Sequence, residues 1–207
     1  MNRLLLIGLV LAGASAVAGR AGRAAVVCRA VCDMTSAEAR AVHGIRLGMT
    51  PQQVLALFPG SAEDGEVRSA LSKPPSPLGV SSFSIRPDKY ASKEQFAGVS
   101  RVQLTLLDGR ILGVNFSYNG PEWKHVDEFI TQFSGAAGLP PPDAWEPYVG
   151  MDTQLKTLRC KDFEVSVFAG GEGGSLNYVL VEDTGARQKL KERREKARGK
   201  REAESRP

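Results

Sequence analysis

The sequence predicts an α+β fold in which helices pack on one face of an antiparallel sheet. Three observations lead to this prediction. Stretches in which apolar and polar residues alternate recur along the chain, as is typical of half-buried strands. Two of these stretches are joined by an Asp-Gly pair at residues 108–109, which favours a tight type I′ hairpin turn. Two helix starts, each with a proline, are expected at Pro51 and Pro121.

The chain begins with a segment that indicates export. Residues 1–18 have the layout of a secretory signal peptide, with Arg3, an apolar run and an Ala-x-Ala cleavage pattern. An uncleaved membrane anchor is the alternative, because Arg20 and Arg23 follow the run directly. Residues 19–34 are expected to form a flexible arm. We therefore expect an exported protein that is periplasmic, or held at the inner membrane if the segment is not cleaved.

Charge separates an acidic middle from a basic tail. Residues 33–183 hold 13 Lys/Arg and 19 Asp/Glu, whereas residues 184–207 hold 10 Lys/Arg and 4 Glu. The tail has almost no apolar residues, which predicts a solvated helix or a disordered segment. Its charge is attracted to anionic lipid or cell-wall polymer, so weak contact with such a surface is expected. The acidic middle lacks the basic, aromatic face of nucleic-acid-binding domains, and no nucleic acid is expected as a partner.

The segment IRLGMTPQQVLALFPG, residues 45–60, predicts a helix start. Thr50 is a candidate N-cap, Pro51 suits the first helical position, and Gln53 completes a Thr-x-x-Gln capping box. Val54 begins an apolar stripe at helical spacing that is expected to face the sheet. We assign the segment a structural role, carried by Gly48, Met49, Thr50, Pro51, Gln53 and Val54.

The remaining elements follow in order along the chain. A short helix is predicted within 33–44, a polar loop at 61–79, and a second long helix within 120–140 that begins at Pro121. Six strands are predicted, at 80–87, 99–107, 110–119, 155–160, 163–169 and 175–183.

This order, helix and three strands followed by helix and three strands, allows two architectures for a domain at 35–183. One is a degenerate tandem repeat of a helix plus a three-stranded meander, with halves at 45–119 and 120–183. The other is a single α+β domain with one antiparallel sheet. In both architectures the helices cover one face of the sheet, and residues 184–207 form a separate charged tail.

The three cysteines are Cys28, Cys32 and Cys160. Export makes a disulfide feasible, and two alternatives follow. One of the first two cysteines bonds Cys160 and ties the arm to the core, or all three are small buried side chains or free thiols. The spacing of Cys28 and Cys32 is not that of a zinc ribbon, and no second pair of ligands follows.

The sequence offers no catalytic or cofactor motif. It contains no HExxH, GxSxG or GxxxxGK[ST] pattern, and neither His43 nor His125 has a metal-ligand partner at a known spacing. We therefore expect no enzyme, no cofactor and no metal. The loop that contains Trp145 and Tyr148 is the candidate for an exposed contact surface.

Residues 45–60 resemble the start of the SmpA/OmlA (BamE-like) family of small bacterial envelope proteins. The matching residues are Ile45, Gly48, Met49, Thr50, Gln53, Val54, Leu57 and Gly60. The resemblance implies helices on an antiparallel sheet, an envelope location and a scaffold or assembly role without catalysis. Beta-lactamase inhibitor proteins are similar in architecture and carry the unit twice. Ala14 stands where the lipidated Cys of such lipoproteins would lie, so a role in outer-membrane barrel assembly is not implied.

The leading functional hypothesis is therefore an exported, non-catalytic envelope protein that binds another envelope protein. The alternative is a periplasmic module that binds a small ligand or a glycan through the Trp145 and Tyr148 loop.

Overall fold

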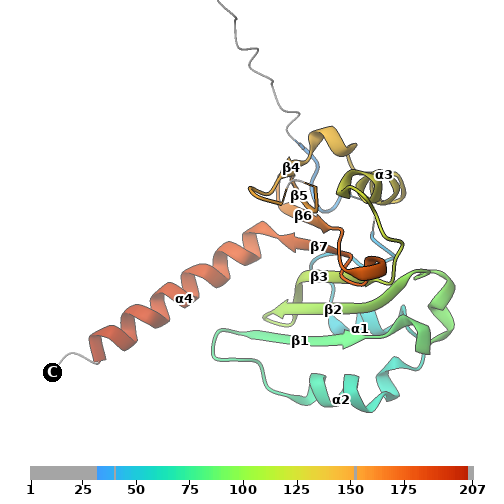
Figure 1. The fold of residues 1–207 in the computed structure, drawn as a ribbon. Helices are drawn as coiled ribbons and strands as arrows, with labels where there is room; N and C mark the ends of the chain where they lie inside the picture. The colour runs from blue at the N-terminus through green and yellow to red at the C-terminus, as the bar shows by residue number, and fades with distance from the viewer. Residues whose placement is uncertain (1–31, 40, 152, 205–207) are drawn as a thin grey trace, which may run out of the picture.

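The structure is a computed structural model that describes residues 32–39, 41–151 and 153–204. Figure 1 shows the strands side by side in one sheet, with the last helix, α4 (Thr184–Glu204), projecting away from it. The predicted signal peptide at 1–18 lies outside the described residues. Among the residues that are described, no helix is both long enough and apolar enough to cross a membrane.

The described residues form seven strands, which pair antiparallel in one open sheet in the order β1-β2-β3-β7-β6-β5-β4. Their bounds are β1 Val80–Ile85, β2 Val99–Leu107, β3 Arg110–Tyr118, β4 Glu146–Pro147, β5 Leu155–Arg159, β6 Phe163–Phe168 and β7 Tyr178–Asp183. The predicted α+β class with an antiparallel sheet is confirmed. Strands β1 to β3 form one meander, strands β5 to β7 form a second, and the two meet where β3 pairs with β7.

The helices differ in part from the prediction. Helix α1 (Pro51–Leu55) begins at the predicted residue. The prediction of a loop at 61–79 is wrong, because α2 (Gly65–Ser72) lies there, and the Asp64 carboxylate caps it by accepting hydrogen bonds from two backbone N–H groups of its first turn.

The long helix α3 (Val126–Ala137) begins later than predicted. Pro121 lies in the loop before it, after a cis peptide bond, and is not the first helical residue. The short helix predicted within 33–44 is also wrong, because the described residues of that segment form turns.

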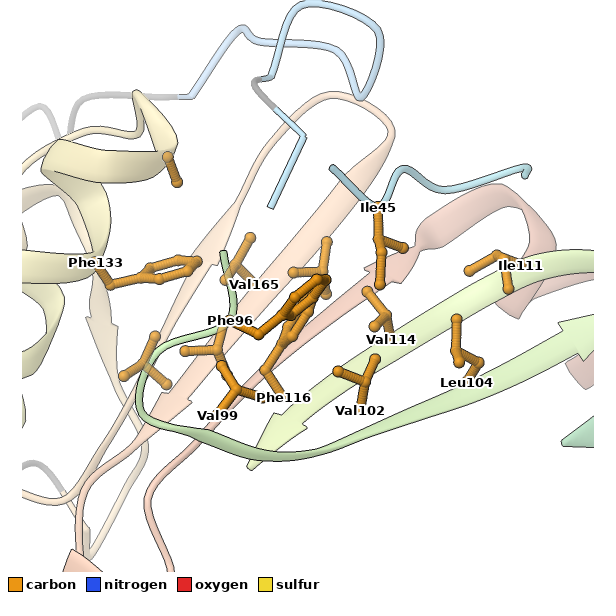
Figure 2. Close-up of a cluster of buried hydrophobic side chains, with 14 of the residues drawn as sticks. Ile45, Phe96, Val99, Val102, Leu104, Ile111, Val114, Phe116, Phe133 and Val165 are labelled. Atoms are coloured by element: carbon orange, nitrogen blue, oxygen red, sulfur yellow. The ribbon is translucent and has the colours of Figure 1, made fainter. Parts of the chain in front are cut away.

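The main hydrophobic core lies on one face of the sheet. Val102, Leu104 and Leu106 of β2 point to this face, and each is at most 1% exposed. Figure 2 shows their neighbours on β3 and the side chains that cover them, among which Ile45 comes from the segment before α1 and Phe133 from α3. The turn between β2 and β3 has positive φ angles of 52° and 75°, as a type I′ turn requires.

Helix α4 packs on the opposite face of the sheet. Leu106 and Leu107 are consecutive in β2, so their side chains point to opposite faces. Leu106 belongs to the main core, whereas Leu107 packs with Leu112 and with Leu190 of α4 in a second cluster. The expectation that the helices of the domain cover one face therefore holds for α1, α2 and α3, whereas α4, which forms from the predicted tail, packs on the other face. The tail at 184–207 is a helix in its described part, and its first turns are docked rather than solvated.

Candidate functional surfaces

The segment 45–60 forms a capped corner beside the sheet. Thr50 Oγ1 accepts a hydrogen bond from the backbone N–H of Gln53 at 3.3 Å, and Gln53 Oε1 accepts one from the backbone N–H of Thr50 at 2.9 Å. The predicted capping box is therefore formed. Pro51 is the first residue of α1, and Val54 is fully buried in the main core.

Gly48 and Met49 attach this corner to β3. Gly48 has a φ of 77°, a conformation that favours glycine. Its N–H donates to Ile111 O at 2.9 Å, and the N–H of Ile111 donates to Met49 O at 2.9 Å. Strand β3 pairs with β7 from Gly113 to Ser117, and Ile111 precedes this paired stretch. The segment therefore bonds backbone groups of β3 that β7 does not reach, which is a structural role.

A disulfide joins Cys32 to Cys160, with Cα atoms 4.5 Å apart. Beside it, the backbone N–H of Lys161 donates to Met34 O at 3.1 Å. These contacts hold the end of the expected flexible arm against the turn between β5 and β6. Cys28, the other candidate for this bond, lies outside the described residues.

Trp145 and Tyr148 have different surroundings. Trp145 is 3% exposed, and its Nε1 donates a hydrogen bond to Pro140 O at 3.0 Å. Its assignment to an exposed contact surface is therefore wrong, because the ring is a satisfied core side chain. Tyr148 is 58% exposed, and Val149 beside it is 95% exposed. Of the predicted pair, Tyr148 is the one that is accessible for contact.

The sheet face opposite the main core stays partly exposed among the described residues, and we call it the open face. Its residues alternate along each strand with the residues of the main core. On β1 to β3 it carries one charged side chain, Arg101, and otherwise uncharged polar side chains, which are Ser82, Ser84, Gln103, Thr105, Asn115 and Ser117. On β5 to β7 it carries partly exposed apolar side chains, which are Leu155, Phe168, Tyr178 and Leu180.

Phe168 and Tyr178 form the aromatic centre of the open face. They are register partners on β6 and β7, and their ring centroids lie 5.4 Å apart at an interplanar angle of 18°. Gly170 makes room for this pair, since a Cβ at that position would lie 2.8 Å from Cε1 of Phe168. Burial raises the pKa of Tyr178, which keeps its hydroxyl group neutral.

Ion pairs border the open face on the side of α4. Arg187 Nη1 lies 2.9 Å from Glu164 Oε1 and 3.2 Å from Glu182 Oε2, and Arg159 Nε lies 3.1 Å from Glu164 Oε2. Burial acts to raise the pKa of Glu164, but the hydrogen bond and charge of Arg187, with the charge of Arg159, outweigh it and hold that pKa below its usual value. The Glu164 carboxylate is therefore ionised and compensated.

A separate pocket lies where the segment before α1 passes the end of β3 and α3. Its volume is about 430 Å³, within the range of small-molecule sites. Aromatic rings form much of its wall, and they belong to His43, Tyr118, Trp123, Phe129 and Phe133. Trp123 stacks on Phe129 with centroids 5.9 Å apart, and Tyr118 meets Phe129 edge-on at 5.2 Å. We call this the aromatic pocket.

His43 has a hydrogen-bond partner at each ring nitrogen. Its Nδ1 lies 2.7 Å from Gln95 O, and because a carbonyl only accepts, Nδ1 carries the proton. Nε2 of the neutral ring then accepts a hydrogen bond from the Tyr118 hydroxyl at 3.3 Å. Burial lowers the pKa of His43 and raises that of Tyr118, so both side chains favour their neutral forms.

In the described part of the chain, no group of three or more His, Cys, Asp or Glu side chains is placed to hold a metal ion. No protein-family model, curated protein or solved structure matches this chain. The resemblance of residues 45–60 to the SmpA/OmlA family therefore stays a hypothesis.

Sequence reasoning missed both the open face and the aromatic pocket. For the open face a pattern was present, because Phe168 and Leu180 are apolar residues on strands whose other face is also apolar. For the pocket no local pattern exists, since His43, Tyr118 and Trp123 come from three separate segments that the fold brings together.

Proposed function

We propose that this chain is an exported, non-catalytic envelope protein that binds another protein through the open face of its sheet. The observation that carries the proposal is the stacked pair of Phe168 and Tyr178, whose register partners on this face are the uncharged Leu155 and Ser117. The centres of protein interfaces are enriched in aromatic residues and depleted of charge, with polar residues around them. Exposed tyrosine rings in such a setting commonly contribute much of the binding free energy.

Export is supported by two features. The disulfide between Cys32 and Cys160 is compatible with an oxidising compartment. The first 18 residues have the composition of a signal peptide. N-terminal sequencing of the protein from its host tests this part of the proposal, with a mature chain that begins at Gly19 as the expected result. A mature chain that retains Met1 would contradict cleavage and favour the anchor.

The proposal includes membership of the SmpA/OmlA family, supported by residues 45–60, and a scaffold or assembly role. It also includes a weak contact of α4 with anionic lipid or cell-wall polymer. Lys191, Arg194 and Arg198 recur at helical spacing on the exposed side of this helix. Co-sedimentation with anionic vesicles, lost when these three residues become Gln, is the expected result. Equal co-sedimentation of the triple variant would contradict this contact.

Site-specific photo-crosslinking tests the binding surface. A benzoylphenylalanine at Tyr178 is expected to capture one specific partner in the intact envelope. The matched control is the same group at Ser69, an exposed residue of α2, the helix whose Val67 packs in the main core on the other face of the sheet. Crosslinks from Tyr178 that are absent from Ser69 support the proposal. The same products from both positions, or none from Tyr178, contradict it.

Variants then measure how much the open face contributes to binding of the crosslinked partner. Phe168→Ser is expected to weaken capture of the crosslinked partner at least about tenfold, as for a central aromatic contact. Leu71→Ser is the control, because Leu71 is a partly exposed apolar residue on α2. If both variants bind the partner equally well, the open face is not the interface.

A further inference from the structure

We infer that the aromatic pocket binds a neutral, mainly aromatic small molecule that donates a hydrogen bond to Tyr118 Oη. The pocket lies against α3 on the main-core side of the sheet, whereas the proposed protein interface is the open face. The inference therefore does not depend on the proposed protein binding. Its support comes from the size of the pocket, the chemistry of its wall and the direction of one hydrogen bond.

The wall selects a flat, apolar ligand. Four of its rings come from Tyr118 at the end of β3 and from Trp123, Phe129 and Phe133 in or before α3. Such rings stack favourably on another aromatic ring. The other described lining residues are mostly alanine, glycine, valine and proline. A glycan needs many hydrogen-bonding partners, and this wall offers few, so the pocket fits an aromatic ligand better than a sugar.

The electrostatics select a neutral ligand. None of the described lining residues carries a charge. The two ionisable rings, His43 and Tyr118, favour their neutral forms because both are largely buried. A charged ligand would lose its hydration in the pocket and find no opposite charge among these residues, which opposes binding.

The hydrogen bonds of His43 decide whether Tyr118 Oη donates a hydrogen bond to a ligand or accepts one from it. The N–H at Nδ1 of His43 is used by Gln95 O, and Nε2 accepts from the hydroxyl of Tyr118. The single proton of that hydroxyl is therefore directed at His43. The remaining lone pairs of Tyr118 Oη can only accept. A ligand N–H or O–H group is therefore complementary to Tyr118 Oη, whereas a ligand acceptor placed at that atom is not.

Two fluorescent probes test these requirements on the full oxidised chain. N-phenyl-1-naphthylamine is neutral and aromatic and has one N–H group, and 8-anilinonaphthalene-1-sulfonate has the same rings with an added sulfonate. We expect the neutral probe to bind saturably at one site per chain and the sulfonate to bind at least about tenfold more weakly. Tyr118→Phe is expected to weaken the neutral probe about two- to tenfold, as for one lost hydrogen bond.

A blocking variant locates the site. Ala136 is an exposed residue of α3 that lines the pocket, so Ala136→Trp is expected to abolish saturable binding. Gly135→Trp is the matched control, since it adds the same ring one residue away, where a Cβ meets no atom within 4 Å. If Ala136→Trp fails to give a wild-type circular dichroism spectrum, Gln132→Trp blocks the same pocket from another exposed position.

Several results would overturn the inference. The absence of saturable binding, or equal affinities of the blocked and control variants, would show that the pocket is not the site. Equal affinities for the two probes would refute the requirement for a neutral ligand. Unchanged affinity in Tyr118→Phe would refute the hydrogen bond. Loss of partner crosslinking at Tyr178 would affect none of these measurements, so the two proposals fail independently.

Discussion

Arg193 of α4 forms a two-point ion pair with Asp108, the first residue of the β2–β3 turn. The Nη1–Oδ1 and Nη2–Oδ2 distances are 2.8 and 2.7 Å. Arg193 Nη1 also donates a hydrogen bond to Leu78 O at 2.8 Å, and Lys189 Nζ lies 3.3 Å from Asp108 Oδ2. Together with buried Leu190, these contacts make the first half of α4 part of the fold, although its sequence is that of a solvated tail.

The docking of α4 is expected to depend on pH. The hydrogen bond from Arg193 lowers the pKa of Asp108 from 3.8 to about 2. Because the folded-state pKa is below the unfolded value, the stabilisation is fully present above pH 3.8 and is lost as the pH falls toward 2. Backbone hydrogen exchange in the first turns of α4, corrected for the intrinsic rate, is expected to accelerate over that range.

Asp108→Asn is the matched variant for this test, because asparagine also tolerates the φ of 52° at this position. It is expected to show faster exchange in α4 already at pH 7 and a smaller acceleration in acid than the wild type, because the Arg187–Glu164 pair is then still left to titrate. Wild-type exchange in the variant at pH 7 would mean that the ion pair does not hold the helix.

Removal of the disulfide is expected to destabilise the whole domain. Cys32 and Cys160 are 128 residues apart in the sequence, so the bond closes a large loop of the unfolded chain. Cys160→Ser is expected to lower the free energy of unfolding by about 2–5 kcal/mol in urea denaturation. Cys28→Ser serves as the control and should keep wild-type stability. A comparable loss in Cys28→Ser would indicate a different pairing.

The corner at residues 45–60 is expected to depend on its cap and its glycine. Thr50→Ala should lower the free energy of unfolding by about 1 kcal/mol, because it removes the side chain that caps α1. Gly48→Ala should lower it by about 1–2 kcal/mol, because a Cβ is unfavourable at a φ of 77°. Gln52→Ala, at an exposed position of α1, should change it by less than about 0.5 kcal/mol. Equal changes in the free energy of unfolding for all three variants would contradict the structural role assigned to this motif.

Trp145 and Tyr148 should respond differently to truncation. Trp145→Ala removes a ring that is 3% exposed and is expected to lower the free energy of unfolding by about 3–5 kcal/mol. Tyr148→Ala removes an exposed ring and should change it by less than about 0.5 kcal/mol. Thermal and urea denaturation of both variants provides the check, and a stable Trp145→Ala protein would contradict the packing.

His43 is expected to make stability fall at mildly acidic pH. Burial lowers its pKa in the folded state below 6.5, so the unfolded chain binds the proton more readily. The stabilisation is therefore complete above pH 6.5 and decreases as the pH falls toward the folded-state pKa. His43→Asn, which suits the φ of 51°, should remove this pH dependence. An identical pH profile for the variant would show that other groups cause the loss.

The prediction from sequence succeeded where local chemistry determines structure. The Asp108-Gly109 turn, the alternation in β2 and the capping box of Thr50 each depend on residues a few positions apart. It missed α2, although the Asp64 cap of that helix is a local signal, and it failed at α4, where a long-range contact decides. Leu190 is one apolar residue in a charged helix, and its burial depends on Leu107 and Leu112, which lie far earlier in the chain.

The candidate sites were less accessible to sequence reasoning than the fold. An aromatic residue in a loop more often plugs the rim of a core than makes an exposed contact, and Trp145 is such a plug, with its N–H bonded to Pro140 O. The aromatic pocket depends on where the segment with His43 crosses α3, and such crossings are set by tertiary packing rather than by periodicity.

The bond between Cys32 and Cys160 also makes α1, α2, α3 and the first five strands part of one covalent ring. The exposed run at residues 73–77, between α2 and β1, lies inside this ring. A protease that cuts once in that run therefore leaves two polypeptides that stay joined and migrate together until a reductant is added. An oxidised chain of this kind tolerates a single nick without losing α1 and α2 from the face of its sheet.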